Sequence, residues 1–220
     1  VSLPNFGVVF KKLPVSLGKS SHASTMADLE GVGYDHSHML IESVLLTGGA
    51  SRRMGVDKAS ILVDGIPNAE RHIGELPSVT VLGRTPVSGA AFLKDSEGYA
   101  GPLACLRRFV PEADLVFVLS CDAVLFRSAV VTAFASILGN DDAVFPVMDG
   151  FDQPLCGLYR ANALEALRKN PDLSKVRDWA ALLKVRRLDT DDLEALGVSP
   201  HWVQSANTPD ELQQLLTLPK

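Results

Sequence analysis

A double-glycine turn directly after a short apolar run is the feature of this sequence best suited to chemistry. The run at residues 43–46 is brief and partly β-branched, which predicts a buried strand that stops at the glycines. Gly48 and Gly49 have no Cβ, so the backbone can bend away from the strand and turn several N–H groups toward one point. Consecutive exposed N–H groups form a concave site for an anion.

Basic side chains follow the two glycines closely. Residues 46–58 read LTGGASRRMGVDK, so Arg52, Arg53 and Lys58 add positive charge near the turn. A strand, a glycine turn and a group of cations together indicate a receptor for a polyphosphate. The spacing is neither that of the Walker A loop nor that of the dinucleotide fingerprint G-x-G-x-x-G. A tight turn with a solvated basic face is the alternative interpretation.

The whole string resembles the signature L-x-G-G-x-S-x-R-M-G-x-D-K of the molybdenum cofactor guanylyltransferases, the MobA family of nucleotidyltransferases. Every specified position is met without a gap, and Thr47 stands where that family more often has alanine. By this resemblance Arg53 and Lys58 are catalytic, and Lys58 provides charge for the α-phosphate and the leaving group. The nucleotide-binding residues that the resemblance implies in this segment are Leu46, Thr47, Gly48, Gly49, Arg53 and Lys58.

Asp122 follows an almost wholly apolar run at residues 115–121. An unpaired carboxylate is costly to bury there, and Mg²⁺ offsets that cost, because it binds one or two carboxylates together with substrate phosphates. The segment S-C-D ending at Asp122 resembles the family's P-C-D element, which implies that Asp122 is catalytic, binds the metal and contacts the nucleotide. Ser120 and Val124 stand where the family has prolines. A cap for the following helix is the alternative role of Asp122.

A second acid, Asp95, lies shortly before a G-P-L-A turn at residues 101–104. By resemblance Asp95 and Gly101 contact the nucleotide, and the free N–H groups of a helix that starts at Gly101-Pro102 suit an anion. An ordinary exposed loop acid is the alternative for Asp95. Residues 82–84, Leu-Gly-Arg, depart from the Asn-containing strand end that the family often has.

Two further elements resemble the family near the C-terminus. The segment starting at Gln153-Pro154 is similar to Q-P-L-x-A-L-Y, and the segment starting at Asn207 is similar to N-T-P-E-D/E-L. The resemblance places Gln153, Pro154 and Asn207 on the pterin side of the active site. Each segment also has a purely structural alternative: a turn at Gln153, and a helix cap after Asn207, where Thr208 and Glu211 form a capping box.

From residue 41 onward, short apolar runs alternate with helical patterns, which predicts a parallel sheet covered by helices. We expect an α/β fold, a three-layer α/β/α Rossmann-like nucleotidyltransferase domain with a mostly parallel sheet, over residues 41–220. Residues 1–40 are expected to form an extension that is disordered or loosely docked. The expected strands span residues 43–46, 79–82, 90–93, 115–119, 143–147, 157–159 and 185–188. The expected helices span residues 68–75, 103–110, 128–138, 161–169, 175–184 and 209–216.

Composition narrows the function classes. The 220 residues are 46% hydrophobic and 21% charged, as in a soluble globular protein. A net charge of −5 argues against nonspecific nucleic-acid binding, and the absence of a run of about eighteen apolar residues argues against a membrane span. Three widely spaced cysteines suggest free buried thiols and a cytoplasmic protein rather than a disulfide framework or zinc site.

The resemblance implies a reaction: GMP passes from GTP to the terminal phosphate of Mo-molybdopterin, pyrophosphate leaves, and Mg²⁺ assists. It also implies transient contact with proteins that supply the cofactor or with molybdoenzymes that receive it. Three alternatives remain open. These are the cytidylyl relative, which more often carries L-A-A-G, a sugar-1-phosphate nucleotidylyltransferase, and a nucleotide-binding relative that has lost catalysis.

Overall fold

The structure, a computed structural model, describes residues 39–48, 57–95 and 101–218. Its strands are β1 (Ile41–Leu46), β2 (Leu62–Val63), β3 (Ile66–Pro67), β4 (Val79–Gly83), β5 (Ala91–Lys94), β6 (Leu115–Ser120), β7 (Ala143–Met148), β8 (Phe151–Asp152), β9 (Cys156–Arg160) and β10 (Val185–Leu188). Its helices are α1 (Asn68–Glu75), α2 (Pro102–Arg108), α3 (Ala129–Ile137), α4 (Ala161–Lys169), α5 (Val176–Ala180), α6 (Thr190–Ala195) and α7 (Pro209–Leu216), with a 3₁₀ turn at η2 (Pro200–Trp202).

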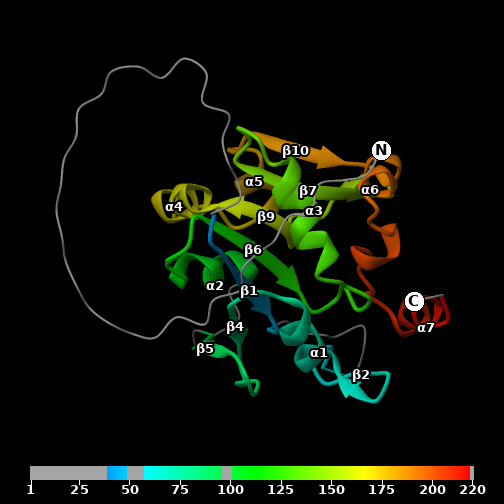
Figure 1. The fold of residues 1–220 in the computed structure, drawn as a ribbon. Helices are drawn as coiled ribbons and strands as arrows, with labels where there is room; N and C mark the ends of the chain where they lie inside the picture. Colours follow the sequence, from blue (N-terminus) through cyan, green and yellow to red (C-terminus); the bar gives the residue numbers. More distant parts are fainter. Residues whose placement is uncertain (1–38, 49–56, 96–100, 219–220) are drawn as a thin grey trace, which may run out of the picture.

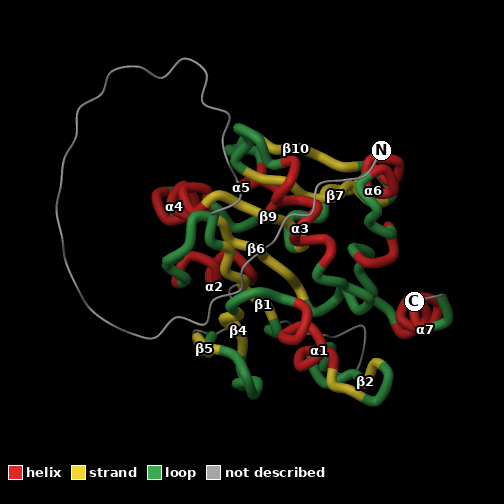
Figure 2. The backbone as a smooth tube through the Cα atoms, viewed as in Figure 1, coloured by secondary structure: helices red, strands yellow, loops and turns green. Residues whose placement is uncertain are grey.

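One sheet organises the molecule, with strand order β10-β7-β9-β6-β1-β4-β5 and with β8 paired to β7 (Figure 1). The pairs β5–β4, β4–β1, β1–β6 and β7–β10 are parallel, whereas β9 is antiparallel to both of its neighbours. The short β2–β3 hairpin lies outside this sheet, beside α1 (Figure 2). The expected mostly parallel sheet is confirmed.

Alternate side chains of the central strands pack into two separate hydrophobic cores, one on each face of the sheet. Leu45 and Phe117 point to the face covered by α1, α3 and α6, while Val44 and Val116 point to the face covered by α2, α4 and α5 (Figure 1). All four are fully buried, as expected for strands covered on both faces, which carry near-continuous apolar runs. The three-layer arrangement predicted from the sequence is therefore confirmed.

The expected elements are present with ends within about two residues of the expected ones, except for the helix expected over residues 175–184, and the short strands β2, β3 and β8 were not expected. The helix expected over residues 175–184 ends at Ala180, because the following N–H groups of Leu182 and Leu183 bond three residues back and tighten the chain. This turn brings Lys184 to Asp142, which pairs with its backbone at the start of β10. Helix α6 was not expected from the sequence.

Helix α6 begins with a capping box made of two acids. The Asp189 side chain accepts the Asp192 N–H, and the Asp192 side chain accepts the Asp189 N–H. Leu193 is the buried residue of this helix. One buried position in six residues gives too short an apolar pattern to predict a helix from periodicity.

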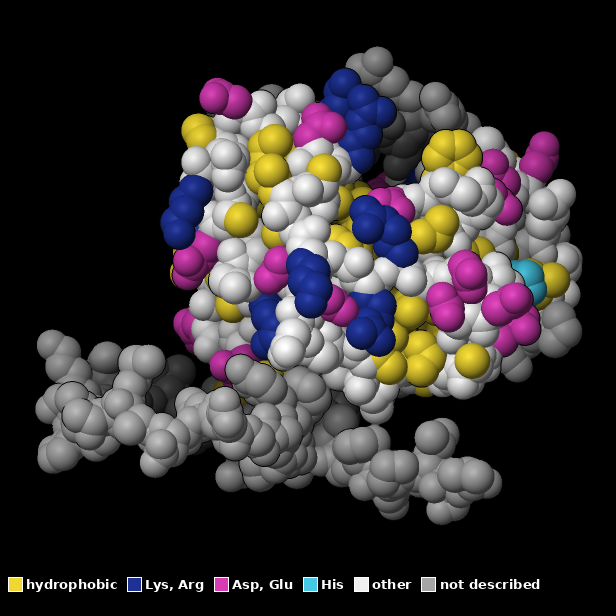
Figure 3. All heavy atoms as spheres, turned by 90° about the horizontal axis from the view of Figure 1, so that it is seen from above, with side chains coloured by type: hydrophobic (Ala, Val, Ile, Leu, Met, Phe, Trp, Pro, Cys, Tyr) yellow, Lys and Arg dark blue, Asp and Glu magenta, His cyan; other side chains and the backbone are white. Residues whose placement is uncertain are grey.

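Charges of both signs are interspersed on the face that carries β10 (Figure 3). Asp141 binds Lys184 and Arg186 at 3.1 and 3.0 Å, and Arg187 holds Asp152 through both of its carboxylate oxygens. Burial alone would raise the pKa of Asp141, but hydrogen bonds from Arg186 and Lys184 outweigh it and lower that pKa.

None of the helices in the described part of the chain is both long and apolar enough to cross a bilayer.

The strand order reverses beside β1. The chain runs from β1 outward to β4 and β5, then returns to place β6 on the other side of β1. Leu46 and Ser120, the last residues of β1 and β6, are paired in register, and the N–H of Cys121 bonds to the Leu46 carbonyl. In open α/β sheets, ligands bind in the crevice outside the carboxyl ends of strands at such a reversal. The segments that follow β1 and β6 lie at this position.

Candidate active site

Three side chains from distant parts of the chain meet outside the ends of β1 and β6. The Lys58 ammonium lies 3.8 Å from a carboxylate oxygen of Asp122 and donates to the Asn207 side-chain oxygen at 3.2 Å. The side chains of Lys58 and Asp122 are 18% and 24% exposed, so solvent and a ligand can reach both. This Lys58–Asp122–Asn207 cluster unites the glycine-turn segment, the S-C-D segment and the C-terminal motif.

Asp122 lies in the loop of residues 121–128 between β6 and α3, which we call the Asp122 loop. The N-cap residue of α3 is Ser128, so Asp122 does not cap that helix and the alternative role suggested by the sequence is excluded. The Asp122 carbonyl accepts the Ala206 N–H at 2.9 Å, which holds the chain entering α7 against the loop. This bond explains how Asn207 reaches Lys58.

Asn207 is fixed from the start of α7. Its N–H donates to the Glu211 carboxylate at 2.6 Å, and the Thr208 hydroxyl accepts the Glu211 N–H at 3.2 Å. The predicted capping box is therefore half right. Thr208 caps the helix as expected, but the Glu211 carboxylate binds the N–H of Asn207 rather than that of the cap residue. Helix capping and the positioning of Asn207 therefore use two hydrogen bonds that share one residue, Glu211.

A second group of polar atoms gathers where β1, β4 and β5 end. The Asp95 N–H bonds to the Gly83 carbonyl at 2.7 Å, and a Cβ on Gly48 would lie 3.2 Å from an Asp95 carboxylate oxygen. Cys105, on α2, donates its thiol to the other Asp95 oxygen at 2.9 Å. Asp95 is thus partly buried against the turn after β1, which is a more constrained position than that of an ordinary exposed loop acid.

The Thr47 side chain packs against Gly83, and this close contact is possible because Gly83 has no side chain. The Thr47 N–H bonds to the Leu82 carbonyl at 3.0 Å, which brings the two strand ends into close contact. A Cβ added to Gly83 would lie 2.0 Å from the Thr47 hydroxyl oxygen, far inside any real contact. Thr47 and Gly83, which belong to two of the places where the sequence departs from the resembled pattern, are therefore neighbours in space.

Among the other predicted residues, Gln153, Pro154 and Gly101 are described by the structure and do not join the cluster. The turn at Gln153-Pro154 is held to β6 by the Ser120 N–H, which bonds to the Leu155 carbonyl at 2.8 Å. Gly101 is the N-cap of α2, with φ of 83°. Among the described residues, the side chain of Gln153 donates only to the Phe151 carbonyl, a bond within the turn itself. Gly49 and Arg53 lie outside the described residues.

The donor set fits a magnesium ion that arrives with its substrate. Within the described ranges there is no group of three or more His, Cys, Asp or Glu side chains that could hold a metal by themselves. Asp122 offers a single accessible carboxylate. Mg²⁺ is commonly bound by one or two carboxylates, with substrate phosphates and water completing its six ligands, whereas Zn²⁺ and Ca²⁺ sites need more protein ligands.

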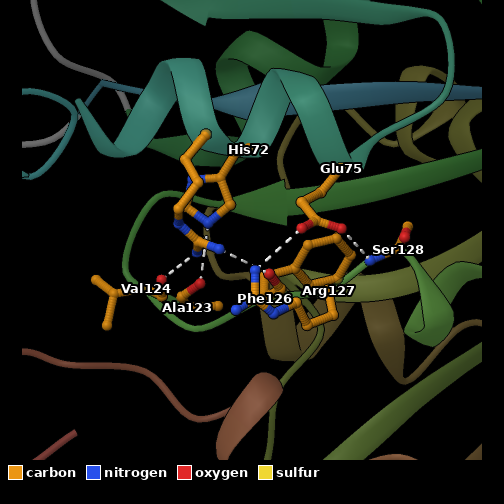
Figure 4. Close-up of polar contacts among 8 residues, drawn as sticks. His72, Glu75, Ala123, Val124, Phe126, Arg127 and Ser128 are labelled. Carbon is orange, nitrogen blue, oxygen red and sulfur yellow. Dashed lines mark hydrogen bonds and ion pairs between the residues drawn. The ribbon is translucent and has the colours of Figure 1, made fainter. Parts of the chain in front are cut away.

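The residues that support the Asp122 loop were not predicted. Asn68, Arg71, His72 and Glu75 project from α1 toward this loop, and several of their contacts are drawn in Figure 4. They belong to no motif and their partners are mostly backbone atoms. Only a polar stripe with i, i+3, i+4 spacing on a helix that is otherwise expected to pack on the sheet could have indicated them.

Solved structures from other organisms share this fold. Molybdopterin-guanine dinucleotide biosynthesis protein A from Archaeoglobus fulgidus matches 79% of this chain and 96% of its own, with a TM-score of 0.66 and 19% identity. A 2-C-methyl-D-erythritol 4-phosphate cytidylyltransferase from Thermus thermophilus matches 80% and 98%, with a TM-score of 0.58 and 17% identity. The fold is that of a Rossmann-like nucleotidyltransferase.

Sequence comparison identifies the family within this class. The family model for the MobA-like NTP transferase domain matches residues 43–189, and the chain belongs to that family. A probable molybdenum cofactor guanylyltransferase from Bacillus velezensis is 29% identical over 192 residues, covering 79% of this chain and 94% of that protein.

Proposed function

We propose that the protein is a molybdenum cofactor guanylyltransferase. It transfers GMP from GTP to the terminal phosphate of Mo-molybdopterin, releases pyrophosphate and forms the molybdopterin guanine dinucleotide. The similarity to proteins of that name supports the proposal. The observation that carries it is the Lys58–Asp122–Asn207 cluster at the strand-order reversal, where a cation and a carboxylate, both accessible, lie 3.8 Å apart.

The reaction requires little proton chemistry from the protein. An oxygen of the acceptor phosphate bonds to the α-phosphorus of GTP, the bond from that phosphorus to the bridging oxygen breaks, and pyrophosphate leaves with the electron pair. The acceptor phosphate is largely ionised at neutral pH, because its second pKa is about 6. A general base is therefore not needed, and positioning and charge stabilisation provide the rate enhancement.

Each residue of the cluster has a role that follows from its charge or from its hydrogen-bonding group. Lys58 places a point charge beside the phosphates and stabilises the negative charge that develops on the leaving pyrophosphate. Asn207 accepts a hydrogen bond from Lys58 and so fixes the direction of that long side chain. Asp122 holds the magnesium ion, which supplies charge neutralisation on the phosphate oxygens when it is bound.

The second group of polar atoms is assigned to the rest of the nucleotide. Gly48 allows close approach to the backbone after β1, and Asp95 offers a carboxylate that can accept hydrogen bonds from a base or ribose. The turn at Gln153 and Pro154 lies on the other side of β6 and is assigned to the pterin. In this assignment GTP and Mo-molybdopterin meet over the Asp122 loop.

The experiment is a comparison of nucleotides with purified protein, Mo-molybdopterin and Mg²⁺. We expect pyrophosphate and the guanine dinucleotide to form with GTP and to depend on both Mg²⁺ and the acceptor. A preference for CTP would contradict the guanylyl assignment and favour the cytidylyl relative. Binding of GTP without transfer would contradict the enzymatic assignment altogether. Heat-denatured protein provides the blank for acceptor breakdown.

A further inference from the structure

The Asp122 loop is held by side chains of α1 that bind its backbone carbonyls. The carbonyls of Cys121, Ala123, Val124 and Phe126 each accept a hydrogen bond from α1. These four carbonyls lie in a loop with no regular secondary structure, so the helix supplies partners that no strand or helix ladder provides. The donors are Asn68, Arg71 and His72, which lie on one side of α1.

Asn68 has the most direct connection to the cluster. Its side chain is fully buried and donates to the Cys121 carbonyl at 2.7 Å and to the Lys58 carbonyl at 3.2 Å. One amide group therefore joins the backbone of Lys58 to the backbone immediately before Asp122. The Asn68 side-chain oxygen has no hydrogen-bond partner among the described residues, a condition that is unfavourable for a buried polar atom. A buried polar residue with such a cost is better explained by what its donor group holds than by packing.

Arg71 and His72 hold the next part of the loop. Arg71 donates to the carbonyls of Val124 and Phe126, and the His72 ring lies 2.9 Å from the Ala123 carbonyl through Nε2. Figure 4 shows the His72 ring directed from α1 toward Ala123. Since a carbonyl only accepts, Nε2 carries the proton. Burial, followed by the nearby Arg71 charge, lowers the pKa of His72 to about 4, so the ring is neutral at physiological pH.

Glu75 closes the far end of the loop. Its carboxylate accepts the Ser128 N–H at 2.8 Å and binds Arg127 at 3.1 Å, as drawn in Figure 4. Burial alone would raise the pKa of Glu75, but these hydrogen bonds outweigh it and lower that pKa. The loop is thereby attached to α1 from its first residue to its last.

Backbone rigidity would otherwise be low here. Proline fixes φ and stiffens a turn, but positions 120 and 124 of this chain are serine and valine. We propose that Asn68, Arg71 and His72 are positioning residues, which hold the Asp122 carboxylate where it can bind a metal–nucleotide complex. This inference depends on the proposed role of Asp122 and extends it to a helix that does not itself reach the ligand.

The test measures metal-linked nucleotide binding rather than turnover. The affinity for GTP with a methylene group between its α- and β-phosphates is measured by calorimetry with Mg²⁺ and with EDTA. The wild-type protein is expected to bind the analogue more tightly with Mg²⁺. In Asn68→Leu, which keeps the number and branching of the side-chain heavy atoms but lacks the donor, we expect this magnesium-dependent gain to fall by about tenfold, the usual effect of losing a group that orients a metal ligand. Affinity in EDTA should change much less.

Arg107→Ala is the matched control. Arg107, on α2, donates to the carbonyls of Leu167, Asn170 and Leu173, so its loss also removes arginine-to-backbone bonds, but on the opposite face of the sheet. We expect this variant to lose stability and to keep the wild-type magnesium-dependent gain. If Asn68→Leu does not fold, Arg71→Ala provides the same measurement from a partly exposed site.

The possible outcomes separate the two proposals. A wild-type protein whose affinity for the analogue does not depend on Mg²⁺ would contradict the role of Asp122 and therefore the proposed function. A magnesium-dependent wild type with an unchanged gain in Asn68→Leu and Arg71→Ala would overturn the positioning role alone. If Arg107→Ala lost as much of the magnesium-dependent gain as Asn68→Leu, the positioning role would also be overturned, because the loss would then reflect lower stability and not the position of Asp122.

Discussion

The Thr47 side chain occupies the space that a side chain at position 83 would need, since a Cβ on Gly83 would lie 2.0 Å from the Thr47 hydroxyl oxygen. Gly83→Ala should therefore destabilise the protein by about 1–3 kcal/mol, as overpacking of a tight contact does. Thr47→Ala in the same chain should recover most of the loss, because it removes the atom that clashes. Urea unfolding of the two single variants and the double variant measures the coupling.

Additive effects of the two substitutions would show that the contact does not exist in solution. The same double-variant cycle applied to nucleotide affinity tells whether this contact shapes the binding site. We expect Gly83→Ala to weaken GTP binding and the double variant to recover it, because both residues adjoin Gly48.

Stability should depend on pH through His72. Burial lowers the pKa of this imidazole from its ordinary value of 6.5 to about 4, so the unfolded chain takes up a proton first as the pH falls. The free energy of unfolding is then lost progressively from about pH 6.5 to about pH 4, by up to ~3 kcal/mol for the whole shift. Above this window the contribution is complete.

His72→Gln is the variant that checks this pH dependence. Glutamine can still donate to the Ala123 carbonyl but does not titrate. Urea unfolding at several pH values should give a smaller loss for the variant than for the wild type between pH 6.5 and 4.5. Equal slopes would mean that His72 is not buried in its neutral form.

The three cysteines should be inert in the folded protein. All three are free and buried. Burial, together with the hydrogen bond to Asp95, raises the pKa of Cys105 to about 12, and burial also raises the pKa values of Cys121 and Cys156. Because the thiolate is the reactive form, iodoacetamide at pH 8 should label the native protein slowly and the urea-unfolded protein at all three sites. Rapid native labelling of Cys105 would contradict its contact with Asp95.

Lys58 should affect nucleotide binding and turnover together. Lys58→Ala removes the only cation that contacts Asp122 among the described residues, so we expect a higher KM for GTP and a lower kcat, each by about tenfold or more. Asn207→Ala leaves the Lys58 charge in place but removes the hydrogen bond that orients the Lys58 side chain. We expect smaller changes in KM and kcat, in the same directions. An Asn207 variant worse than the Lys58 variant would reverse the roles assigned to them.

The sequence predicts the strands and their ends well, because a buried strand in a sheet covered on both faces needs a continuous apolar run, as in β6. Residues that follow such runs closely, such as Gly48 and Asp122, are then forced to one edge of the sheet. Contacts between side chains and backbone carbonyls carry no such pattern. Asn68 reads in the sequence as an ordinary first residue of a helix, and its partners at Lys58 and Cys121 are visible only in the folded chain.

Helix ends depend on tertiary contacts in the same way. The helical pattern continues past Ala180, but the chain leaves the helix because Lys184 must pair with Asp142 to begin β10. The unusual residues Thr47 and Gly83 could each be noticed in the sequence, whereas their compensation for one another requires the parallel pairing of β1 and β4.

In the proposed function, Asp122 holds the metal on which GMP transfer depends. Asp122→Asn keeps the shape of the side chain and removes its charge, so the most direct measurement is pyrophosphate release from GTP and Mo-molybdopterin by this variant at saturating Mg²⁺. We predict a rate about a hundredfold or more below that of the wild type, with an unchanged melting temperature. A folded Asp122→Asn protein that releases pyrophosphate at the wild-type rate would rule out the metal-binding role of Asp122.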